Sequence, residues 1–61
     1  MKYQVGDLFF IDGRVWTLIE KKKGHPLVLE SGERTANLYS YEIKDWMKLY
    51  QDSKYYPVVK E

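Results

Sequence analysis

The side chains that could carry acid–base, nucleophilic or metal chemistry are few and scattered along this chain. His25 is the single histidine, and without cysteine the chain lacks the usual ligand set of a zinc site. The nine carboxylates fall at turns or along one helical stretch, without the spacing of an acid–base pair. No glycine-rich phosphate loop occurs. We therefore predict no catalytic residues, no cofactor and no metal, and we expect that the protein is not an enzyme.

Aromatic residues and one run of lysines are the side chains best suited to binding a partner. The chain has six tyrosines, two tryptophans and two phenylalanines. Aromatic residues often anchor protein interfaces, and beside cations they also form stacking platforms for single-stranded nucleic acid. The residues that we predict to make contacts are Phe9, Trp16, Tyr39, Tyr41, Tyr55 and Tyr56, together with Lys21, Lys22 and Lys23.

Each of these features also has a purely structural interpretation. The three lysines can form a solvated loop that aids solubility and blocks edge pairing. Phe9 and Trp16 can pack beneath a short helix as a second small core. The four tyrosines among the predicted contacts are too many to be buried together in a 61-residue domain, so we expect some exposed tyrosine surface.

The overall charge limits the kind of partner. Ten basic and nine acidic residues give a net charge of +1, and the positive charge is concentrated in Lys21–Lys23. Strong non-specific nucleic-acid binding is disfavoured by so small an excess. The first residues do not show a charged start followed by an apolar stretch, so we expect no signal peptide. No apolar run reaches membrane-spanning length, and the lack of cysteine fits a reducing compartment. We expect a cytoplasmic protein without a membrane partner.

The elements that position these residues begin with a hairpin. Asp12-Gly13 lies between two apolar runs, and this pair suits a type I′ turn because both central residues need positive φ. We expect the strands to cover about residues 7–11 and 14–22. The turn predicts that Ile11 faces Arg14, Phe10 faces Val15, Phe9 faces Trp16 and Leu8 faces Thr17, with Gly6 opposite Ile19.

This register makes both faces of the first hairpin apolar, which is unusual for an antiparallel pair in a small protein. Something must therefore cover the second face: a helix, a second copy or a partner. We expect the face of Phe9 and Trp16 to be the outer one, partly covered by the helix. One face carries Leu8, Phe10, Val15, Thr17 and Ile19, and the other carries Val5, Phe9, Ile11, Trp16 and Leu18.

A second hairpin follows, with strands at about residues 27–30 and 33–38. If Ser31-Gly32 is its two-residue turn, Leu29 faces Arg34. Its strands place Leu27, Leu29, Ala36 and Leu38 on one apolar face.

A short helix comes next, followed by a last strand over about residues 55–59. Ser40 is the expected cap of the helix. Pro57 cannot donate to a strand ladder, so we expect the last strand at an edge of the sheet. The helix carries one apolar stripe of Ile43, Trp46, Met47 and Tyr50.

The element order, the Gly6-Asp7 opening, the Ser31-Gly32 hairpin and the helix that begins near Ser40 resemble the small SH3-like accessory proteins of phages and prophages of Gram-positive bacteria. The chain lacks the tryptophan pair of peptide-binding SH3 domains, so proline-peptide binding is not implied. The resemblance implies a mainly β fold with one short helix: a single SH3-like domain over residues 1–61, built as a small, partly open five-stranded barrel with the helix before the last strand.

These observations predict a small non-enzymatic binding protein, and the resemblance implies a phage-type modulator or inhibitor that binds a host protein. The alternative is a nucleic-acid-binding barrel that uses Lys21–Lys23 and surface tyrosines. We expect a monomer or a weak homodimer.

Overall fold

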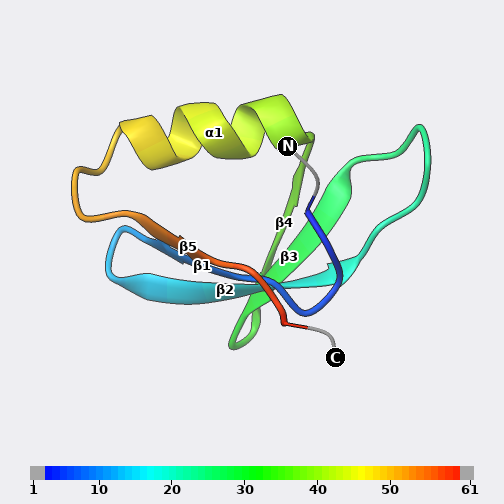
Figure 1. The fold of residues 1–61 in the computed structure, drawn as a ribbon, viewed down its shortest axis with the longest axis horizontal. Coiled ribbons are helices and arrows are strands. Elements are labelled where there is room, and N and C mark those ends of the chain that lie inside the picture. The colour runs from blue at the N-terminus through cyan, green and yellow to red at the C-terminus, as the bar shows by residue number, and fades with distance from the viewer. Residues whose placement is uncertain (1–2, 60–61) are drawn as a thin grey trace.

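Five antiparallel strands form one sheet, and a single short helix precedes the last strand (Figure 1). The computed structural model describes residues 3–59. The predicted mainly β fold is confirmed. The sheet has the order β4-β3-β2-β1-β5 and is not closed, since β4 and β5 are its two edges. The elements are β1 (Leu8–Ile11), β2 (Arg14–Glu20), β3 (Leu27–Ser31), β4 (Arg34–Leu38), α1 (Ser40–Lys48) and β5 (Lys54–Tyr56).

The first hairpin forms as its turn residues predict. Asp12 and Gly13 have φ values of 54° and 74°, which is the backbone that a type I′ turn requires. The predicted register over β1 and β2 is confirmed from Ile11–Arg14 to Leu8–Thr17. Before β1 the pairing departs from the prediction, because Gly6 and Asp7 together bond to Leu18 in the manner of a β-bulge.

The second hairpin turns one residue later than expected. Its central residues are Gly32 and Glu33, and only Gly32 has a positive φ, of 62°. A type II′ turn needs this geometry at its first central position. Ser31 therefore pairs with Arg34, and Leu29 pairs with Ala36 rather than with Arg34. The shift places an apolar residue opposite Leu29 and keeps the predicted apolar face intact.

The core lies between the helix and the face of the sheet that carries Phe9 and Trp16. Our expectation that this was the outer face is wrong, since Phe9 is fully buried and Trp16 is 6% exposed. The predicted cover is confirmed, because the ring of Trp46 on α1 meets Trp16 edge-on, with 5.2 Å between ring centroids. A nine-residue helix is unstable alone, so it gains its stability from this packing. The buried apolar side chains are Tyr3, Phe9, Ile11, Trp16, Leu18, Leu27, Leu29 and Ile43.

The helix begins one residue earlier than the predicted Ser40 cap implies. Tyr39 is the N-cap and Ser40 is the first helical residue. The backbone N–H of Tyr39 donates to the Glu42 carboxylate over 2.8 Å, which satisfies one amide at the start of the helix. The predicted stripe is confirmed, with Ile43 buried and Trp46, Met47 and Tyr50 half-buried against the core.

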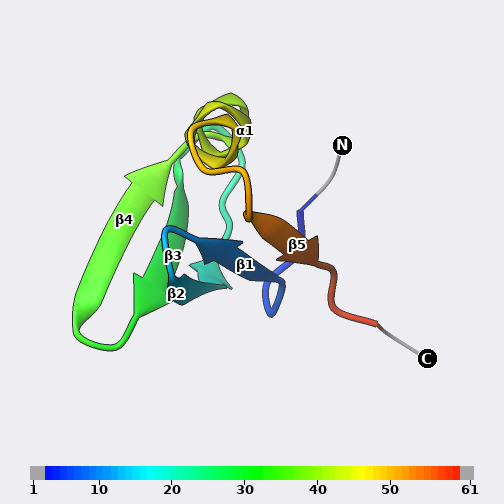
Figure 2. The ribbon, with the colours of Figure 1, turned by 90° about the vertical axis from the view of Figure 1, so that its left-hand side faces the viewer.

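The last strand pairs with β1 and is an edge strand, as Pro57 predicts. Figure 2, turned by 90° from Figure 1, shows β5 and β4 at opposite sides of the sheet with α1 above the space between them. The helix thus covers the interior that the open sheet leaves uncovered. This arrangement brings the start of α1 close to the loop that joins β2 to β3, where the predicted lysines lie.

Candidate functional site

Asp7 is a buried carboxylate, and buried ionisable groups often occur at functional sites. It is fully buried and accepts three hydrogen bonds. Gln4 and Val58 donate through their backbone N–H groups over 2.8 Å and 2.7 Å, and the Tyr55 hydroxyl donates over 2.7 Å. All three hydrogen-bond donors are residues of this chain, and Asp7 does not line the groove described below. Its role is to join the first turn to the chain beyond β5.

The pKa values of this cluster agree with that role. Burial alone would raise the pKa of Asp7, but the hydrogen bonds from Val58, Gln4 and Tyr55 and the charge of Lys21 hold it below its usual value of 3.8. Burial and the hydrogen bond to Asp7 raise the pKa of Tyr55 to about 12. The carboxylate therefore stays ionised and the phenol stays protonated near neutral pH, so this pair acts as a fixed structural contact.

Three of the predicted contact aromatics serve the fold. Phe9 and Trp16 belong to the core and offer no surface to a partner. Tyr55 is half-buried, its ring is stacked on Phe9 with 5.1 Å between centroids, and Tyr3 meets it edge-on at 5.2 Å. Tyr3 itself is a buried core residue, and no sequence pattern singled it out.

The opposite face of the sheet is apolar and exposed, and we call it the outer sheet face. The pairing of Leu8 with both Thr17 and Tyr56 brings three strands onto this surface. Leu8 is 38% exposed, Val15 is 53% exposed and Tyr56 is 50% exposed. In Figure 1, α1 lies on the other side of these strands. The outer sheet face consists of Leu8, Phe10, Val15, Thr17, Ile19 and Tyr56, and it is flanked by the exposed charged residues Lys54 and Glu30, which pair with Phe10 and Thr17.

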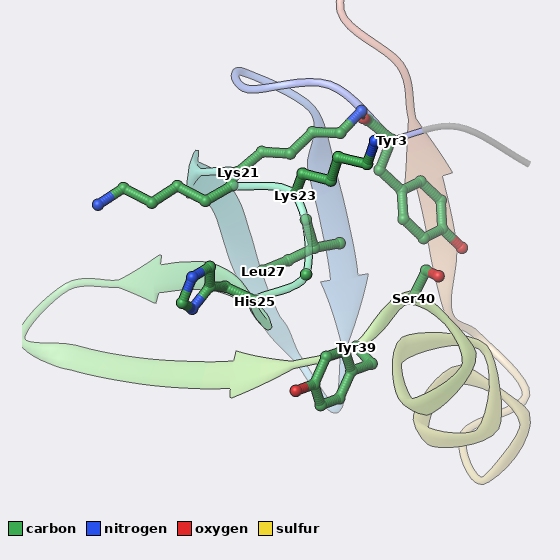
Figure 3. Close-up of a pocket in the computed structure, with 9 residues that line it drawn as sticks. Tyr3, Lys21, Lys23, His25, Leu27, Tyr39 and Ser40 are labelled. Carbon is green, nitrogen blue, oxygen red and sulfur yellow. The ribbon is translucent and has the colours of Figure 1, made fainter.

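A groove of about 450 Å³ lies where the β2–β3 loop approaches the start of α1, and we call it the basic groove. Figure 3 shows Lys21 and Lys23 extending toward Tyr3, with Leu27 between them and Tyr39. None of the described residues that line it is acidic. The lining residues with functional side chains are Tyr3, Lys21, Lys22, Lys23, His25, Tyr39 and Ser40.

The three lysines differ in how they are held. The ammonium group of Lys21 donates to the backbone carbonyl of Tyr3 over 2.7 Å, which fixes this cation at one end of the groove. Lys22 lies 3.8 Å from the Glu20 carboxylate, and both side chains are exposed, so this ion pair contributes little. Lys23 has no carboxylate within 4.0 Å among residues 3–59. The basic groove therefore has a net positive charge.

Tyr39 and Tyr41 form an exposed aromatic pair at the edge of the basic groove. Their rings are nearly parallel, with 5° between the ring planes and 5.8 Å between centroids. Tyr39 is 40% exposed and Tyr41 is 63% exposed. The structure thus brings the predicted residues Lys21–Lys23 and Tyr39 together around the groove. Tyr41 stacks on Tyr39 without lining the groove, and Tyr56 lies apart on the outer sheet face.

Two further properties of the described residues bear on function. Among residues 3–59, no three His, Asp or Glu side chains gather in a way that could hold a metal ion. No helix in this part of the chain is long and apolar enough to cross a membrane.

Comparisons with protein-family models, with curated proteins and with solved structures found no match for this chain.

Proposed function

We propose that the protein is a small non-enzymatic binding protein that docks its outer sheet face on an apolar surface of a host protein. It acts in the cytoplasm as a modulator or inhibitor, as implied by the phage accessory proteins that its sequence resembles. One observation carries the proposal: the central strands of the sheet present Leu8, Val15 and Ile19 to solvent, each more than a third exposed. Contiguous exposed apolar surface typically marks an interaction site.

The composition of this face fits a protein partner. It combines aliphatic side chains with Tyr56, a residue type enriched at protein interfaces. No helix or strand of residues 3–59 packs on it, because α1 covers the inner face. A chain this short buries little apolar surface, and apolar side chains left in water add nothing to its stability. Covering them on a partner would remove apolar area from water at about 25 cal/mol per Å² before the costs of association.

The test is affinity capture with a variant that places a charge in the outer sheet face. Tagged parent protein, Val15→Lys and Val59→Lys serve as baits in a lysate of a Gram-positive host. Val59 is 80% exposed and lies outside the sheet, so its substitution is a matched control. We expect a partner retained by the parent and by Val59→Lys, and lost by folded Val15→Lys. Retention of the same partners by all three baits would refute the proposal.

Sedimentation at two protein concentrations separates a host protein from a second copy of the chain. Under the proposal the parent sediments as a monomer at both. A dimer that forms with rising concentration and disappears in Val15→Lys would show that a second copy covers the face, and would overturn the choice of partner.

A further inference from the structure

We infer that the basic groove binds a nucleotide unit, with its phosphate beside Lys21 and Lys23 and its base stacked on the Tyr39–Tyr41 pair. The groove shares no residue with the outer sheet face. The inference is therefore independent of the proposed protein-binding function. The same unit can come from a free mononucleotide or from a single strand, and the experiment below distinguishes these sources.

The charge of the groove selects an anionic ligand. Lys21 is fixed by the carbonyl of Tyr3, so its ammonium group is already positioned before a ligand arrives. Lys23 extends toward the same residue in Figure 3, so two cations lie on one side of the groove. No described residue that lines the groove is acidic. The charge of Lys21 also acts on the buried Asp7 carboxylate, whereas Lys23 has no carboxylate within 4.0 Å among residues 3–59 and is the cation more available to a phosphate.

The aromatic part of the groove selects a ligand that also has a flat ring. Leu27 is buried between the lysine side and Tyr39, which gives the groove an apolar floor. Tyr39 and Tyr41 already stack on each other in a nearly parallel arrangement, and both rings keep exposed surface. A base can extend such a stack, because every base has a π-face.

Size and net charge favour a local site over a surface that coats nucleic acid. The groove, at about 450 Å³, lies in the range of small-ligand pockets. The chain has a net charge of only +1, so most of its surface does not attract phosphate. An acidic peptide would satisfy the lysines but would leave the parallel tyrosine pair without a stacking partner. A nucleotide satisfies both.

The experiment is an amide chemical-shift titration of the full chain with hexathymidylate at about 50 mM salt. We expect shifts at residues 21–25 and 39–41, and none on the outer sheet face. Thymidine 5′-monophosphate and a hexaglutamate peptide are titrated in parallel. Equal affinity for the monophosphate and the hexamer would identify a free nucleotide as sufficient, and tighter binding of the hexamer would identify a strand. Both results support a nucleotide site.

Variants test the two halves of the groove separately. Tyr39→Leu should weaken hexathymidylate binding by about 5- to 150-fold, the loss that corresponds to one base–aromatic stack. Lys23→Gln should weaken binding and lower the salt slope by about 0.7 for each lost phosphate contact. Tyr56→Leu and Lys44→Gln are the matched controls, because both residues are exposed and lie outside the groove. We expect them to bind as the parent does.

Several outcomes would overturn the inference. They are the absence of any shift at low salt, shifts confined to residues outside the groove, unchanged affinity in folded Tyr39→Leu, and hexaglutamate binding as tight as that of hexathymidylate. None of these results would affect the proposed protein-binding function, whose test depends on Val15.

Discussion

The two faces of the β1–β2 hairpin have similar apolar composition and different environments. Phe9 and Phe10 are identical neighbours, yet Phe9 is fully buried beneath α1 while Phe10 is half-buried on the outer sheet face. Tyr55 and Tyr56 repeat the contrast on β5. Strand periodicity assigns residues to a face, but only contacts with distant elements decide which face becomes the core.

The largest expected effect comes from truncating the adjacent phenylalanines. Phe9→Ala should lower the free energy of unfolding by about 3–5 kcal/mol, because it removes a fully buried ring and leaves a cavity. That loss is comparable to the whole stability of a domain this small, so the variant should be largely unfolded. Phe10→Ala should cost less, about 1–2 kcal/mol, since its ring is only partly removed from water. Urea denaturation followed by circular dichroism measures both, and equal losses would break the comparison.

Asp7→Asn tests whether the buried carboxylate stabilises the fold through its hydrogen bonds to Gln4, Tyr55 and Val58. We expect a loss of about 2–3 kcal/mol at pH 7, because an amide replaces an ion that accepts three hydrogen bonds. Asp52→Asn, at an exposed turn, should have little effect. A stability of Asp7→Asn equal to that of the parent at pH 7 would contradict the structural role.

The same variant predicts a dependence on acid. The folded pKa of Asp7 lies below the ordinary 3.8, so its contribution is present above that value and is lost as pH falls through the folded pKa. The parent should therefore lose its advantage over Asp7→Asn in this acid range. Denaturation curves at pH 7 and pH 3 measure the change, and a constant difference would be inconsistent with a lowered pKa.

Substitution of the adjacent tyrosines of β5 should have a smaller effect on the free energy of unfolding, and its pH dependence lies in the alkaline range. Tyr55→Phe should cost about 1–2 kcal/mol, because it removes the hydroxyl that donates to Asp7, whereas Tyr56→Phe should cost almost nothing. The pKa of Tyr55 is raised from 10.0 to about 12, so its contribution is present below pH 10 and is lost between these values. Alkaline unfolding curves of the parent and both variants test this, and identical curves would refute it.

The smallest expected effect on stability belongs to the outer sheet face. Val15→Lys should change the free energy of unfolding by less than about 0.5 kcal/mol, because the side chain is more than half exposed. Thermal unfolding measures this change. A large loss would show that the outer sheet face contributes to folding, and would leave little reason to assign it to a partner.

The parts of the fold that sequence predicted are those set by local chemistry. Asp12-Gly13 needs no distant contact to form its turn, so the register of β1 and β2 followed directly. The second turn was predicted one residue too early, at Ser31-Gly32, because its glycine occupies the first central position rather than the second. The stripe of α1 was likewise readable from helical spacing.

The parts that could not be predicted depend on residues far apart in the chain. Both faces of the hairpin were equally apolar, and docking of Trp46 on Trp16 shows which one is covered. Asp7 had the ordinary appearance of a turn residue, although its partners Tyr55 and Val58 lie 48 and 51 positions away. The basic groove exists because Tyr3, the lysines and Tyr39 meet only in the folded chain.

The contact of Trp16 with Trp46 has a practical consequence, because the chain contains only two tryptophans and both take part. All tryptophan fluorescence thus comes from one junction between helix and sheet. Separation of α1 from β2 would change the emission without any added label, while ligand binding in the groove or on the outer sheet face would leave both indoles in place. Intrinsic tryptophan fluorescence therefore reports directly on the docking of α1 against the sheet.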